Sequence, residues 1–101
     1  MKRKSKIENL VETIRECIAS GRYLDTYHSH TRQSERKIAR PEILFVLKNG
    51  YHERMKDSYD ERYKEWNYAI RGKTIDKRIL RIIVSFDSRG LLIITAIELE
   101  S

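Results

Sequence analysis

His28, Arg32 and Arg36 recur every four residues in the first third of the chain. On a helix, this spacing places all three side chains on one face. Cleaving RNA without a metal requires a base for the 2′-hydroxyl, an acid for the leaving 5′-oxygen and cations for the phosphorane charge. The imidazole can move the protons and the guanidiniums can bind the phosphate. The spacing therefore indicates a catalytic site for phosphodiesters; the alternative is a solvated helix face with intrahelical ion pairs.

The other polar residues near this face are expected to play smaller parts. Glu35 lies about one-third of a turn away from the face, where pairing with Arg32 or Arg36 is favoured over a role as base, and we expect it to assist substrate binding. His30 and His52 are predicted to lie at the surface. The histidines and acids show no metal-ligand spacing, so we expect no metal and no cofactor.

A second group of candidates comes from strand alternation near the C-terminus. If Leu80, Ile82 and Val84 face the helices, Arg81 faces the opposite side of the sheet. Arg71, beside Ile70, is expected on the same face of its own strand. A cationic open sheet face suits RNA, so Arg81 completes the predicted catalytic cleft and Arg71 is predicted to bind substrate. The alternative is that these arginines only keep an uncovered face in contact with solvent.

Aromatic residues are concentrated in the middle third of the chain. Trp66 and Tyr68 alternate with polar residues and are predicted to be core. Tyr59 and Tyr63 lie in a polar segment, so we predict that they contact substrate, where they can stack on bases.

Composition limits the class of protein. The 101 residues, 40% of them hydrophobic, suffice for one domain with a core. The net charge of +6 favours a polyanionic partner, although the basic residues within 2–6 can form a solvated tail. The single cysteine, Cys17, is typical of a reducing cytoplasm and is expected to be buried or half-buried. We find no signal-peptide pattern, and no apolar run approaches the roughly 20 residues that span a membrane.

The hydrophobic periods predict an α+β domain with N-terminal helices packed on one face of an antiparallel sheet of about four strands. The expected helices cover residues 5–19, 28–40 and 41–49, and residues 23–27 are expected to form either a brief strand or an extended entry. The expected strands are an edge strand at 51–55, then 66–71, a central strand at 79–86 and a last strand at 91–99. Residues 57–64 and 72–77 are predicted as connections, and 87–90 as a turn. The single domain is divided into a basic tail and helix, 1–21, and a core, 22–99.

The order of these motifs resembles a known family. The pattern consists of Thr26-x-His28-x3-Arg32-x3-Arg36-x-Ile38, Pro41-Glu42-Ile43-x2-Val46-Leu47-x-Asn49-Gly50, Trp66-x-Tyr68-x-Ile70-x-Gly72 and Ile93-Ile94-Thr95-Ala96. Over roughly residues 23–97 it resembles the family called domain of unknown function 4258. That family is similar to BrnT-like and RelE-like toxins of bacterial toxin–antitoxin pairs.

The resemblance implies a RelE/BrnT-like RNase fold, messenger RNA as substrate and an antitoxin as partner. We therefore predict a type II toxin, a metal-independent mRNA endoribonuclease in the cytoplasm. The alternatives are a non-catalytic module of the same fold that binds RNA or protein, and a structural adaptor. A homodimer that closes the edge strand is a rival to the antitoxin complex.

Overall fold

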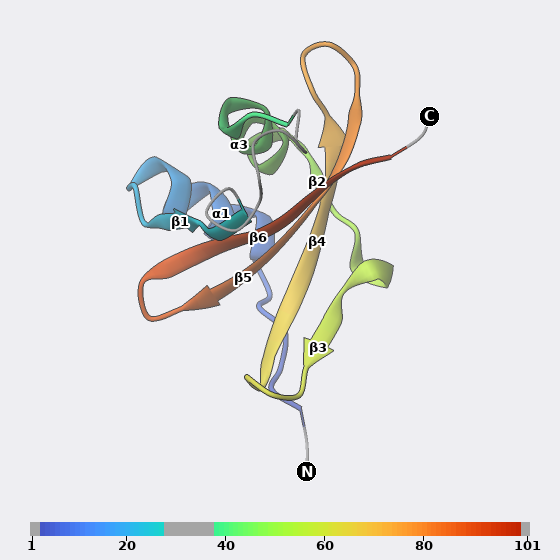
Figure 1. Ribbon diagram of the computed structural model, residues 1–101. Coiled ribbons are helices and arrows are strands. Elements are labelled where there is room, and N and C mark those ends of the chain that lie inside the picture. The colour runs from blue at the N-terminus through green and yellow to red at the C-terminus, as the bar shows by residue number, and fades with distance from the viewer. Residues whose placement is uncertain (1–2, 28–37, 100–101) are drawn as a thin grey trace.

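A computed structural model describes residues 3–27 and 38–99 of the chain (Figure 1). The predicted polar helix over 28–40 lies almost wholly outside the described residues. The elements, in chain order, are α1 (Leu10–Ala19), β1 (Tyr23–Asp25), α3 (Arg40–Asn49), β2 (Tyr51–His52), the 3₁₀ turn η2 (Arg54–Lys56), β3 (Ser58–Asp60), β4 (Glu65–Lys73), β5 (Ile79–Asp87) and β6 (Gly90–Leu99).

The strands of the described segments form one sheet in the order β1-β6-β5-β4-β2, and β3 pairs with β4 as well. All pairings are antiparallel except β1 with β6. The α+β class is confirmed, and β5 is central as predicted. The expected number of about four strands was too low, because β1 pairs with the sheet and the polar sequence Ser58-Tyr59-Asp60 forms an edge strand without an alternating apolar pattern.

The N-terminal segment differs most from the prediction. The first helix starts at Leu10, not near residue 5. Residues before it run along β4 instead: the Ile7 amide donates to the Tyr68 hydroxyl at 2.9 Å, and the Trp66 indole N–H donates to the Lys4 carbonyl at 2.6 Å. These contacts replace the first turn of the expected helix. Gly21 follows the helix with a φ of +75°, the left-handed conformation that glycine commonly adopts where a helix ends.

The second described helix, α3, begins where Pro41 predicts it. Pro is compatible with the first turn, and the Glu42 carboxylate accepts the Ala39 backbone N–H at 2.9 Å. Past its end the chain packs closely on β4, because a Cβ at Gly50 would lie 2.5 Å from the Arg71 carbonyl oxygen. This close approach sets where β2 and the residues after it meet β4.

The core lies between the sheet and the two described helices, which cover one face of it (Figure 1). Leu80, Ile82 and Val84 are fully buried there, as the alternation predicts, and Cys17 is buried with them. In β6 the register shifts: Ile83 pairs with Thr95, and Val84 with Ile93. Ile94 is therefore an extra, bulged residue.

No helix within the described segments is long and apolar enough to cross a membrane.

Candidate functional site: an arginine cluster on one face of the sheet

Two arginines lie side by side on the sheet face that points away from α1 and α3. The strand register forms a row across β2, β4, β5 and β6 from Tyr51 to Arg71, Arg81 and Ile97. Ile70 beside Arg71, and Leu80 and Ile82 beside Arg81, are buried in the core on the other face. The alternation thus correctly places Arg71 and Arg81 on one face.

Glu53 joins the two arginines. Its carboxylate accepts two hydrogen bonds from Arg81, from Nε at 2.7 Å and Nη2 at 3.1 Å, and one from Arg71 Nη1 at 3.3 Å. Such a fork is the strongest geometry for a guanidinium–carboxylate pair. The Glu53 backbone N–H donates to the Ala69 carbonyl at 2.8 Å, so the residue is fixed where β2 ends.

The cluster is only partly open to solvent. The side chains of Glu53, Arg81 and Arg71 are 15%, 18% and 34% exposed. Hydrogen bonds from Arg81 and then Arg71 lower the pKa of Glu53, and Glu53 in turn raises the pKa of Arg81. All three groups are therefore charged at neutral pH and carry a net charge of +1, which a phosphate can approach.

Tyr51 extends the cluster. It pairs in register with Arg71 and is 57% exposed. An exposed phenol beside two guanidiniums offers a stacking surface next to groups that are able to bind a phosphate. We call Tyr51, Glu53, Arg71 and Arg81 the arginine cluster. Sequence reasoning missed Glu53 and Tyr51 as site residues; the signal was their shared face on the predicted edge strand, but their pairing partner was not readable from the sequence.

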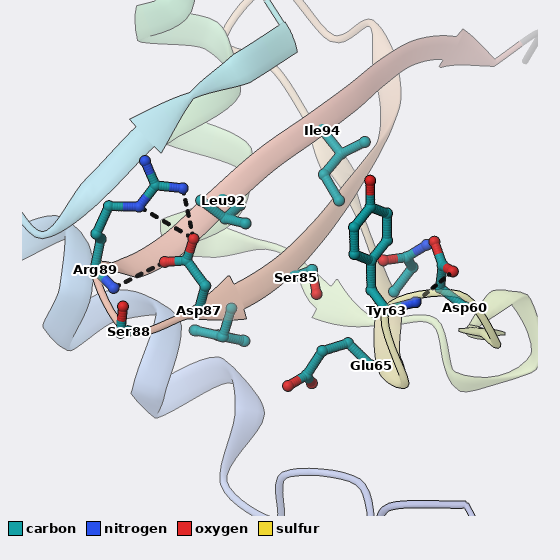
Figure 2. Close-up of a pocket in the computed structure, with 11 residues that line it drawn as sticks. Asp60, Tyr63, Glu65, Ser85, Asp87, Ser88, Arg89, Leu92 and Ile94 are labelled. Carbon is teal, nitrogen blue, oxygen red and sulfur yellow. Dashed lines mark hydrogen bonds and ion pairs between the residues drawn. The ribbon is translucent and has the colours of Figure 1, made fainter.

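A groove of about 680 Å³ lies farther along the sheet, near the β5–β6 turn (Figure 2). Tyr63, which is 70% exposed, forms one wall beside Ile94. Asn67 and Ser85, which have the same strand parity as Arg71 and Arg81, also line it, together with Leu92. The groove therefore opens on the same face as the arginine cluster.

The residues of the arginine cluster and of the groove all lie in a segment of the chain that matches one sequence family. The family described as "Domain of unknown function (DUF4258)" matches residues 25–98, most of the chain. The chain belongs to the DUF4258 family. This confirms the predicted family resemblance over nearly the expected range. No curated protein and no solved structure shows significant similarity to the chain.

The remaining aromatic candidate of this DUF4258 chain lies elsewhere. Tyr59 packs edge-on against Trp66, with ring centroids 5.2 Å apart, and the Arg3 guanidinium lies 5.1 Å from the Tyr59 centroid. It does not line the groove with Tyr63. The structure thus separates two tyrosines that the sequence grouped together.

His52 was wrongly predicted to lie at the surface. Its side chain is 10% exposed, and Nε2 lies 2.7 Å from an oxygen of the fully buried Asp57 carboxylate. Asp57 also pairs with Lys6 at 2.9 Å and accepts the Ala69 backbone N–H at 3.0 Å. Asp57 thus fills the gap between β2 and β3 along the edge of β4, and His52 and Lys6 satisfy the rest of this buried carboxylate.

The predicted residues His28, Arg32, Glu35 and Arg36 lie outside the described residues, so their proposed roles remain predictions. Within residues 3–27 and 38–99, no group of three or more His, Cys, Asp and Glu side chains is arranged to hold a metal ion.

Proposed function

We propose that this DUF4258 protein is the toxin of a type II toxin–antitoxin pair and cleaves messenger RNA without a metal. The observation that carries the proposal is the arginine cluster: two guanidiniums held by one ionised carboxylate, beside an exposed tyrosine, on one face of the sheet. The helices on one side of a mostly antiparallel sheet agree with a RelE/BrnT-like fold, which is part of the proposal.

RNA binding comes first. A phosphodiester of the RNA displaces part of the contact that Glu53 makes with Arg81 and Arg71. It then accepts hydrogen bonds from the free N–H groups of these arginines. The net charge of +6 draws the polyanion to the protein. Tyr51 stacks on a base next to the bound phosphate.

Cleavage then needs two proton transfers. The 2′-oxygen attacks phosphorus, its proton passes to a base, and the bond from phosphorus to the 5′-oxygen breaks as an acid protonates that oxygen. The products are a 2′,3′-cyclic phosphate and a 5′-hydroxyl. In the proposal, Glu53 accepts the proton, His28 donates one to the leaving oxygen, and Arg32 and Arg36 add to the stabilisation by Arg71 and Arg81.

A cognate antitoxin completes the proposal. Acidic side chains of that partner would meet Arg71 and Arg81, because complementary charge sets register and speeds encounter. β2 lies at the edge of the sheet, as predicted, but it covers only Tyr51–His52 and not the expected 51–55, because the chain turns into η2. Its free edge can accept an added strand. A homodimer through the same edge is the rival arrangement.

The second candidate is a module that binds RNA without cleaving it. One observation favours it: the arginines lower the pKa of Glu53, which keeps the carboxylate ionised but makes it a weak base.

The test incubates the purified protein with labelled RNA in EDTA and identifies the product ends. Cyclic phosphate ends from wild type, lost on the order of 10²-fold or more in Glu53→Gln and His28→Ala, are expected. Lys48→Ala, which removes an exposed cation from α3, is the control. RNA that is bound but stays intact would favour the binding module.

A further inference from the structure

We propose that the groove at Tyr63, Asn67 and Leu92 is a base-binding subsite for a purine that carries an amino group, adenine above all. The inference rests on the proposed RNA function, and it names which part of the RNA the second site on this face would recognise.

The position of the groove fits one RNA strand that also reaches the arginine cluster. Asn67 precedes Arg71 by four residues on β4, and Ser85 follows Arg81 by four residues on β5. Strands rise about 3.3 Å per residue, so the two sites are about 13 Å apart along the same face. A base in the groove would therefore belong to a nucleotide near the bound phosphate, not to a separate molecule.

The walls of the groove suit a flat ring. Tyr63 stands 70% exposed on one side, and the β6 bulge helps to bring Leu92 and Ile94 into the same groove (Figure 2). Aromatic rings stack on bases of any type, and the branched side chains cover the other face of the ring. The volume of about 680 Å³ accommodates a nucleoside.

The polar groups of the groove select the kind of base. Among the described residues, no hydrogen bond engages the Asn67 side chain, whose amide offers a donor and an acceptor together. That pair matches the N7 and amino group of adenine. The Ser85 hydroxyl already donates to the Trp66 carbonyl at 2.8 Å, so it can only accept.

The charges at the rim disfavour a phosphate in the groove. Asp60, Glu65 and Asp87 line it, and two of these carboxylates are paired with cations: Asp87 with Arg89 at 2.6 Å, and Glu65 with Lys4 at 2.5 Å. Three carboxylates against two cations leave the rim with a net charge of −1. Carboxylates repel phosphate and accept N–H groups, so they favour bases with an amino group over uracil, which presents two carbonyl oxygens. The phosphate stays at the arginine cluster and the base enters the groove.

The experiment titrates the isotope-labelled full chain with nucleosides, which lack phosphate, and follows backbone amide shifts by NMR. Adenosine is expected to shift the amides of Asn67, Ser85 and Ile94. It should bind roughly tenfold tighter than uridine and than purine riboside, which lacks only the amino group. Tyr63→Ala should weaken adenosine about tenfold and Tyr63→Phe should not. Asn67→Ala should abolish the preference over purine riboside, whereas Ile75→Ala, at an exposed side chain of the β4–β5 hairpin that does not line the groove, should leave it unchanged.

The outcomes separate this inference from the proposed function. Uridine binding as well as adenosine, or no nucleoside shifting these amides, overturns the base subsite, even if RNA cleavage still depends on Arg81. Adenosine binding in the groove of a protein that neither binds nor cleaves RNA keeps the subsite and overturns the proposed function. A basic peptide that shifts the same amides while nucleosides do not would assign the groove to a protein partner and overturn the inference.

Discussion

At the scale of single residues, Glu53 decides what the two arginines can do. Without it, Arg71 and Arg81 would repel each other on neighbouring strands; with it, they are held in fixed positions on a surface of net charge +1. Its side chain is only 15% exposed, so these contacts are worth more than those of a solvated surface pair.

Replacing Glu53 by Gln tests this role through stability. The variant should lose about 1–3 kcal/mol of unfolding free energy at pH 7, because charge-assisted hydrogen bonds are lost. In the folded state, the arginines lower the pKa of Glu53 below its ordinary value of 4.5. Its contribution to the free energy of unfolding is therefore present above about pH 4.5 and is lost as the pH falls through the folded pKa. Urea unfolding should show the two proteins converging in acid. An equal difference at pH 7 and well below pH 4.5 would contradict the assignment.

At the scale of elements, β4 positions the site, because β2, β3 and β5 all pair with it. At Gly50, just after α3, the backbone packs directly on the backbone of β4. Asp57 fills the gap between β2 and β3, the two short strands that pair with β4. The site therefore depends on two contacts at some distance from the arginines.

Gly50→Ala should be strongly destabilising. The added Cβ would lie 2.5 Å from the Arg71 carbonyl oxygen and 2.7 Å from that of Val46, both backbone atoms. Relief requires moving β2 or β4, for a loss of about 1–3 kcal/mol. Gly21→Ala is the comparison. A Cβ at Gly21 would have no atom within 4 Å, so this variant should lose only the about 1 kcal/mol that a φ of +75° costs a residue with a side chain. Thermal unfolding measures both, and a milder effect at Gly50 than at Gly21 would refute the close contact.

Asp57→Ala should cost about 3–5 kcal/mol, because Lys6 and His52 lose the buried carboxylate that they share and the Ala69 N–H loses its acceptor. Chemical unfolding checks this, with Asp76→Ala as the comparison, because the Asp76 carboxylate is exposed and, among the described residues, bonds only to Thr74 and Arg78 of its own β4–β5 hairpin. A loss no larger than that of Asp76→Ala would show that Asp57 does not stabilise the edge of β4.

The parts of the fold and of the candidate site that could be predicted from the sequence are those that depend on residues near one another in the chain. The alternation around Leu80, Ile82 and Val84 is local, so the central strand and the face of Arg81 could be read from the sequence. The start of the first helix depends on Trp66 and Tyr68, some 60 residues away, which hold residues before Leu10 in an extended form. Glu53 joins the arginines through strand pairing, which no local pattern specifies.

At the scale of the whole molecule, we propose that the net charge of +6 and the arginine cluster bind an anionic chain. RNA affinity should fall steeply with salt. Arg71→Ala and Arg81→Ala should each reduce the log–log slope by about 0.7, the contribution of one phosphate of a single strand. Anisotropy of labelled RNA across a salt series measures the slope, and an affinity independent of salt would favour the protein-adaptor interpretation.

The most direct test of the central claim compares two double variants of equal net charge. Arg71→Ala/Arg81→Ala removes both guanidiniums of the arginine cluster. Arg15→Ala/Lys48→Ala removes two exposed cations from α1 and α3, together with the 2.7 Å hydrogen bond that Arg15 Nε donates to the Lys48 carbonyl. The measurement is the affinity for a short single-stranded RNA at one low salt concentration, with both variants shown to be folded. The account predicts that the first variant loses at least tenfold in affinity and the second about twofold or less. Equal losses would contradict it, because the RNA would then respond to net charge and not to this face of the sheet.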